Sequence, residues 1–219
     1  MLGVLLGNVS RDKCDRGTVV TLNDELLAGL GAPGLEQIAG MLGTDQLTAR
    51  KVTEAVSGTI VGGLAYNAAH PDGADALRGA LDDHMDADPF NGDVASLTRD
   101  GHSILGHIFG AQATERAAAR LAQLAGVGSA RIMKLMPLIA PMIMSLLANR
   151  AVERGMDSAA LADDLDRERT SLSGGLGELI DELLGDVLDG SGMPRPPAPY
   201  PAYRTEREVT PGSTYNADW

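Results

Sequence analysis

The sequence predicts an all-α protein, and three observations support this fold class. Hydrophobic residues make up 44% of the 219 residues, but aromatic residues make up only 3%. Ala, Leu, Gly and Met are abundant, and cores made of Ala, Leu and Met suit closely packed helices, whereas sheets favour β-branched and aromatic residues. Apolar positions also recur at helical spacing along most of the chain. We therefore expect a compact helical bundle with a substantial core.

The first predicted helices are short and are punctuated by glycine. "DELLAGLG" (24–31) can be capped by Asn23 or Asp24, and Gly29 and Gly31 close it. "GLEQIAGMLG" (34–43) places its aliphatic residues at helical spacing and ends at a glycine.

A longer helix follows over 46–69, capped by Thr44 or Asp45. A shorter helix is predicted over roughly 73–85, and the polar loop after it extends to Gly101. The apolar face predicted for the longer helix consists of Leu47, Val52, Val56, Ile60, Val61 and Leu64.

The second half of the chain repeats this order. Residues 107–126 parallel 24–43, and 127–151 parallel the long helix of the first half. Leu161 and Leu165 then match Leu77 and Leu81. The pattern predicts two similar three-helix modules, about 22–86 and 101–170, that cover each other's apolar faces.

Four segments together resemble the YidB-like family of bacterial proteins: "DELLAGLG", "GLEQIAGMLG", "DGHSILGHIFG" and "LMPLIAPMIMSLLANR". The resemblance covers roughly residues 22–190. It implies a compact all-helical fold without an assigned function, and it supplies no catalytic residues. We expect a single domain over 22–190, an N-terminal extension over 1–21 and a disordered Pro-rich tail over 191–219.

Charge and cysteine content limit the possible partners and the compartment. The formal net charge is −12, and an acidic surface repels nucleic-acid phosphates and anionic lipids. Cys14 is the single cysteine, so no intrachain disulfide can form and a reducing cytoplasm fits best. No signal-peptide pattern is found at the start of the sequence.

Two histidines in "RDGHSILGHIFG" (99–110) raise the question of a metal or acid/base site. His102 and His107 are five residues apart, whereas a zinc pair on one helix favours a spacing of four. Asp100 is predicted to cap a helix that starts here. We therefore interpret this stretch as the start of a helix with buried aliphatic residues and not as a metal or acid/base site.

An acidic cluster precedes the histidines and supports an alternative function. Asp82, Asp83, His84 and Asp86 could serve a metal-dependent enzyme, with His102 or His107 as a further ligand. The loop departs from the EF-hand pattern, so we expect no resident metal or cofactor.

Residues 132–148 form the most apolar segment of the chain. Pro137 and Pro141 each remove a helical hydrogen bond, which predicts a kink or a break into two helices. We expect a buried core helix; membrane association or a partner-binding surface are the alternatives. The adaptable methionines that could line such a surface are Met133, Met136, Met142 and Met144.

Residues 175–190 give the clearest amphipathic pattern, with one acidic face. This helix can dock on its own core, pair with a copy of itself or enter the groove of another chain. Its apolar face consists of Leu176, Leu179, Ile180, Leu183, Leu184, Val187 and Leu188.

The absence of a catalytic motif and this amphipathic pattern together predict a non-catalytic, cytoplasmic module for protein interaction or self-assembly. We expect a Met-rich groove that the 175–190 helix covers or exchanges between subunits. The predicted interaction residues are Met136, Met142, Leu176, Leu179, Ile180, Leu183, Leu184 and Val187.

Overall fold

The computed structural model describes residues 20–82, 84, 90, 93–171, 178, 180–182 and 184–185. Within these residues every regular element is a helix, which confirms the all-α fold class. The predicted extension and tail lie almost entirely outside the described residues. The labelled helices are α1 (Leu22–Leu42), α2 (Gln46–Ala68), α3 (Pro71–Asp82), α4 (Val94–Ile108), α5 (Ala111–Ala125), α6 (Ser129–Glu153) and α7 (Ser158–Ser171).

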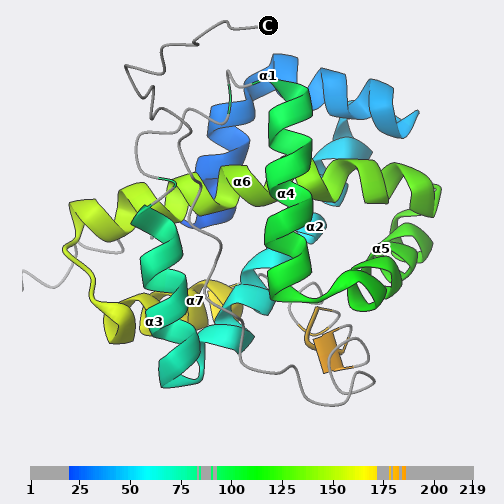
Figure 1. Cartoon of the computed structure of the whole chain (residues 1–219). Helices are drawn as coiled ribbons and strands as arrows, with labels where there is room; N and C mark the ends of the chain where they lie inside the picture. The colour runs from blue at the N-terminus through cyan, green and yellow to red at the C-terminus, as the bar shows by residue number, and fades with distance from the viewer. Residues whose placement is uncertain are drawn as a thin grey trace, which may run out of the picture.

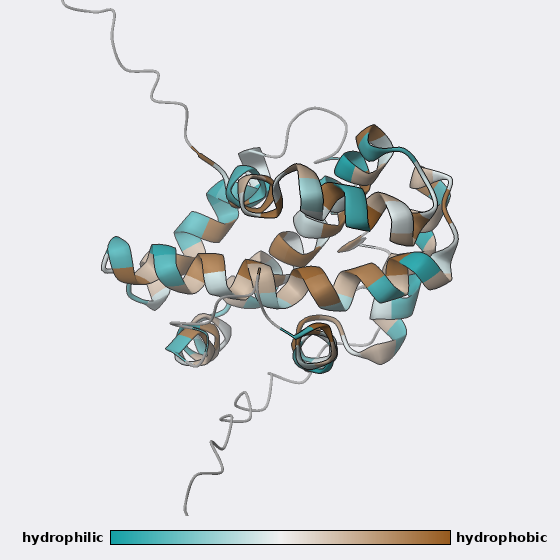
Figure 2. Cartoon of the chain, turned by 90° about the horizontal axis from the view of Figure 1, so that it is seen from above, coloured by the Kyte–Doolittle hydropathy of each residue, from teal (hydrophilic) through white to brown (hydrophobic). Residues whose placement is uncertain are grey.

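Two long helices, α2 and α6, form the centre of the bundle. Helix α6 contacts α1 to α5, and α2 contacts every other labelled helix. Figure 1 shows α4 crossing α6 steeply, with α1 above this crossing and α3 and α7 below it. In Figure 2 the hydrophobic residues gather where the helices face one another. The core is built largely from Ala, Leu and Ile side chains; Ala and Leu are as the composition predicts, but Met contributes only Met136 and Met144 among the buried core residues.

Helix α1 contains both helices that were predicted over 24–43, joined at a glycine. Gly31 has φ 57° and ψ −169°, which interrupts the helical backbone, and Gly43 ends the helix with φ 66°. The predicted cap at Asn23 or Asp24 is wrong, because the helix begins at Leu22 and Thr21 is its N-cap. Asp24 instead completes a capping box, accepting a hydrogen bond from the Thr21 backbone N–H at 3.1 Å.

Helix α2 follows the prediction closely except in its first turn. Asp45 caps it by accepting a hydrogen bond from the Thr48 backbone N–H at 2.9 Å. Five of the six predicted face residues are buried, but Leu47 is 64% exposed. Leu47 therefore does not belong to the core, because the apolar face of α2 begins a turn later, at Ala49 and Val52.

Helix α4 begins earlier than predicted. Asp93 is its N-cap, accepting a hydrogen bond from the Ser96 backbone N–H at 3.0 Å. Asp100 thus lies inside the helix, and both its predicted capping role and the loop predicted over 94–101 are wrong. Gly101 is buried in the middle of α4 rather than placed at a helix start.

Of the two outcomes predicted for Pro137 and Pro141, a kink or a break into two helices, the break does not occur, and the kink stays a prediction. Helix α6 runs as one element from Ser129 to Glu153. Its burial against five other helices holds the backbone helical despite the two missing N–H groups. Both prolines are themselves buried. The internal duplication into two modules stays a prediction.

Candidate functional site

An apolar groove lies between α1, α4 and α6 and has a volume of about 550 Å³. Among the described residues that line it, none carries a charge. Val94 on its rim is 64% exposed. Gln37 of α1 is the one large polar side chain among the described lining residues. The larger apolar side chains of the lining are Leu30, Ile38, Met41, Phe90, Val94, Leu97, Leu135, Leu138, Ile139 and Met142.

Each helix presents its groove residues by its own periodicity. Val94 and Leu97 lie three apart in the first turn of α4, and Leu138 and Met142 lie four apart on α6. On α1 the groove residues surround the backbone interruption at Gly31. The groove therefore depends on three helices that only the tertiary fold brings together.

The two methionines predicted as interaction residues have different positions. Met136 is completely buried and belongs to the core, so it does not contribute to an accessible surface. Met142 is half-buried and lines the groove. An interaction role for Met142 stays a prediction, whereas the side chain of Met136 lies on the side of α6 that faces the core.

A second feature is the strap, by which we mean the described residues within 178–185. Ile180 and Leu184 are 1% and 6% exposed and join the core. They pack on α2 at Gly62, not in the apolar groove. Of the predicted amphipathic face, these two residues therefore dock on their own chain. The remaining members lie outside the described residues: Leu176, Leu179, Leu183, Val187 and Leu188.

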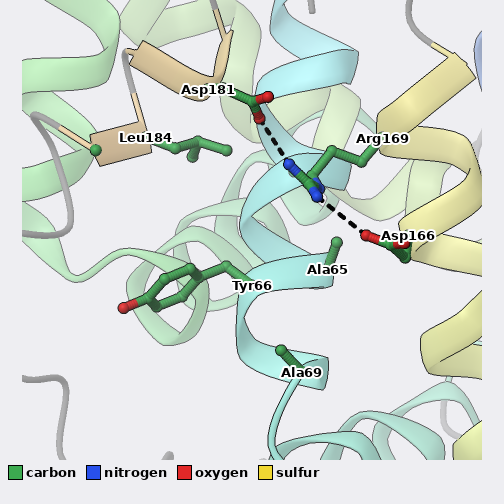
Figure 3. Close-up of a pocket in the computed structure, with 9 residues that line it drawn as sticks. Ala65, Tyr66, Ala69, Asp166, Arg169, Asp181 and Leu184 are labelled. Carbon is green, nitrogen blue, oxygen red and sulfur yellow. Dashed lines mark hydrogen bonds and ion pairs between the residues drawn. The ribbon is translucent and has the colours of Figure 1, made fainter.

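A smaller pocket of about 370 Å³ lies beside the strap (Figure 3). Arg169 of α7 reaches into it and pairs with Asp181 of the strap at 2.9 Å and with Asp166 at 3.1 Å. The hydrogen bond from Arg169 to Asp166, and to a smaller extent the one to Asp181, raise the pKa of the guanidinium. Tyr66 of α2, 42% exposed, lines the pocket beside Leu184.

A buried ion cluster joins α6, α7 and α1, and the sequence did not reveal it. Arg150 of α6 is 4% exposed and pairs with Glu25 at 2.6 Å, Asp164 at 3.3 Å and Glu168. Burial opposes the charge of Arg150, but the hydrogen bonds to Glu168 and Glu25 outweigh it and raise its pKa. Glu168 also accepts a hydrogen bond from the Leu22 backbone N–H at 3.0 Å. The cluster thus ties α1 and α7 to α6.

The residues of the alternative metal site do not converge in the part of the chain that the structure describes. Asp82 pairs with Arg78 at 2.6 Å, and Asp83 and Asp86 lie outside the described residues. The Nδ1 atoms of His102 and His107 each lie 2.7 Å from a backbone oxygen of their own helix. Among the described residues there is no group of three or more acidic, His or Cys side chains that could hold a metal.

Helix α6 is long and apolar enough to cross a membrane by length and composition. In the fold, however, 67% of its most apolar window is buried against the rest of the protein. Core helices of soluble proteins pass the same test of length and composition. The burial supports the core assignment of 132–148.

Of three comparisons with known proteins, one finds a match. No curated protein and no solved structure matches the chain. A family model described as a bacterial protein of unknown function (DUF937) matches residues 24–150, which cover nearly all of α1, all of α2 to α5 and most of α6 and end before α7 and the strap. Since this match covers more than half of the sequence, the chain belongs to the DUF937, or YidB-like, family of bacterial proteins of unknown function.

Proposed function

We propose that this protein is a non-catalytic, cytoplasmic interaction module whose apolar groove binds an amphipathic helix of a partner protein. The single observation that carries the proposal is the groove itself. It is lined by uncharged residues from three helices, and its rim exposes a large hydrophobic side chain, Val94. Apolar grooves between helices are a recurrent way to bind the apolar face of another helix.

The groove has the chemistry for such a partner. Leu97, Leu138 and Met142 are only half-buried and can be covered further by an added apolar face. Met142 and Met41 are unbranched and flexible, so they can adapt to different side chains.

The net charge of the chain indicates which charge the polar residues of the partner helix should carry. With a net charge of −12, the protein attracts cationic partners and repels anionic ones. We therefore expect a helix whose polar positions are rich in Lys and Arg. The same field disfavours an anionic membrane as the ligand of the groove.

Site-specific photocrosslinking in cells tests the proposal. A benzophenone amino acid replaces Val94 at the groove rim; the matched control carries it at Val152, which is 54% exposed on α6 and does not line the groove. We expect an adduct at position 94 alone. The partner segment found in the crosslinked peptide should have the sequence pattern of a basic amphipathic helix.

A second substitution ties the adduct to the groove. Leu97→Glu places a charge in the lining near the start of α4 and should abolish the adduct at position 94, while circular dichroism shows unchanged helix content. A crosslink to a second copy of this chain or to lipid would contradict the proposed partner. The absence of any adduct, or equal adducts at positions 94 and 152, would also contradict it.

A further inference from the structure

The strap contacts its own chain in the way a bound peptide would, through two apolar side chains and one ion pair. We propose that the strap site, formed by Gly62, Ala65 and Arg169, recognises an acidic amphipathic helix, and that it can take the strap of a second copy of this chain. The strap site shares no lining residue with the apolar groove, so this inference does not rest on the proposed function.

The apolar contacts of the strap depend on the absence of a side chain at Gly62 of α2. A Cβ added at Gly62 would lie 2.6 Å from Cδ1 of Leu184 and 3.4 Å from Cγ2 of Ile180. The strap therefore lies directly against the backbone of α2, where a larger residue would push it away. Ile180 and Leu184 are four residues apart, so one face of a helical turn carries both.

The polar part of the recognition selects an acidic ligand. Arg169 pairs with Asp181 at 2.9 Å, and the two side chains are 34% and 54% exposed. Glu178 and Glu182 are exposed on the same segment. The described strap residues thus combine two buried aliphatic side chains with three acidic ones, and Arg169 fixes the register of Asp181 against α7.

The fit between the strap and α2 is incomplete. The pocket of about 370 Å³ beside it is lined on α2 by Ala65, Tyr66 and Ala69 as well as Gly62. Tyr66, which lines this pocket, is 42% exposed, so the strap leaves part of this face of α2 uncovered. A small contact of this kind is suited to exchange.

A second copy supplies a ligand that already matches the site. Each copy carries both a strap and a strap site, so two copies can exchange straps and form the same contacts twice. Six residues, 172–177, join α7 to the strap, and three of them are glycine. Because so few residues connect the two, the strap of the same chain has an effective concentration on the order of millimolar and competes strongly. A test must therefore disable that strap.

The test uses a fluorescently labelled peptide of residues 175–190 and the full chain with Leu184→Glu. This substitution places a charge at a position that is 6% exposed and leaves the strap site intact. We expect a saturable rise in fluorescence anisotropy, with binding at least fivefold tighter than to the unchanged chain. The matched control, Glu182→Gln, alters an exposed strap residue and should behave as the unchanged chain does.

A charge swap separates recognition by Arg169 from a merely structural role. Adding Arg169→Glu to the Leu184→Glu chain should weaken binding of the natural peptide at least fivefold, and a peptide with Asp181→Arg should restore it. The proposal is overturned if the peptide does not bind a Leu184→Glu chain that retains its helical circular dichroism. Equal binding to all chains, or no restoration by the swapped peptide, overturns it as well.

A second measurement remains decisive if Leu184→Glu disturbs folding. In that case two variant chains are used. The Ile180→Glu chain has a disabled strap and an intact strap site, and the Gly62→Leu chain has an intact strap and a strap site filled by the leucine side chain. Native mass spectrometry of the two full chains mixed should reveal a complex of twice 22.8 kDa that neither chain forms alone. A mixture that stays at 22.8 kDa overturns the exchange.

Discussion

Gly101 of α4 lies directly against the backbone of Pro137 of α6, so that a Cβ added at Gly101 would be 1.8 Å from the Pro137 carbonyl oxygen. In a regular helix this oxygen accepts a hydrogen bond from the N–H of residue 141, but residue 141 is a proline and has none. The glycine Cα–H groups face a carbonyl that has lost its usual donor, an arrangement suited to a weak Cα–H···O contact. The α4–α6 crossing therefore depends on the sequence of both helices.

Gly101→Ala should destabilise the protein, whereas Gly106→Ala on the same helix should not. The first methyl group meets backbone atoms, which cannot rotate away, so we expect a loss of about 2 kcal/mol or more in the free energy of unfolding. Apart from the neighbouring backbone of α4 itself, nothing lies within 4 Å of the second methyl group, and replacing a helical glycine there should raise the free energy of unfolding by up to about 1 kcal/mol. Urea denaturation of both variants measures the difference. Equal effects would show that the close contact does not exist.

Arg150→Met should strongly destabilise the fold. It leaves Glu168, which is 7% exposed, without its cationic partner, and breaking a buried ion pair on one side costs about 3–5 kcal/mol. Arg154→Met is the matched control, because Arg154 is 48% exposed and pairs with the same Asp164. That control should lose less than about 1 kcal/mol.

The double variant Arg150→Met/Glu168→Leu identifies the cause of the loss. If the loss comes from an uncompensated buried carboxylate, this variant should unfold at a higher denaturant concentration than Arg150→Met alone. A double variant that is less stable than the single one would argue against this cause.

Asp45→Ala should lower the melting temperature at neutral pH, with an effect that shrinks in acid. The hydrogen bonds from the Thr48 backbone N–H and hydroxyl lower the pKa of the Asp45 carboxyl below its ordinary value of 3.8. A lowered pKa in the folded state means that the stabilisation is complete above 3.8 and is lost as the pH falls through the lower, folded value. Thermal melts between pH 7 and 2 measure this convergence.

Asp45→Asn is the control for that experiment, because asparagine is also a good N-cap but does not titrate. At pH 7 the melting temperature of Asp45→Asn should be closer to that of the unchanged chain than the melting temperature of Asp45→Ala is. A constant gap between the alanine variant and the unchanged chain down to pH 2 would contradict the assigned shift.

Met136→Ala and Met142→Ala should lower the free energy of unfolding by different amounts, because the first methionine is in the core and the second is in the groove wall. Truncating the fully buried Met136 should cost about 2–5 kcal/mol. Truncating the half-buried Met142 should cost roughly 1 kcal/mol or less, since less apolar surface is lost. Similar losses for both would contradict the different burial of the two side chains.

The helices themselves could largely be predicted from the sequence, because their signals are local. Gly43 ends α1 as expected, Asp45 caps α2, and Val56, Ile60 and Leu64 are buried at helical spacing. The start of α4 could not be predicted, because Asp93 and Asp100 are both acceptable caps. The residues between them face partly toward the groove and solvent, so they carry no strong apolar period.

The candidate sites could be predicted only in part. The amphipathic pattern of 175–190 identified Ile180 and Leu184 as residues that seek apolar contacts, and Met142 was identified as an adaptable side chain of the apolar segment; their interaction roles stay predictions. The groove wall from α1 and α4 was not identified, because it combines residues that are distant in the chain. Arg150 was missed for the same reason: its partner Glu25 lies 125 residues away.

The sequence by itself determined the fold class, the positions of most helices and the acidic, amphipathic character of 175–190. These properties follow from composition, caps and periodicity, which act within a few turns of helix. Only the tertiary structure decided that Gly101 marks a helix crossing, that Pro137 and Pro141 stay within one helix and that Arg150 is an internal ion-pair centre. In each case the deciding contact comes from another helix, and its energy outweighs the local preference.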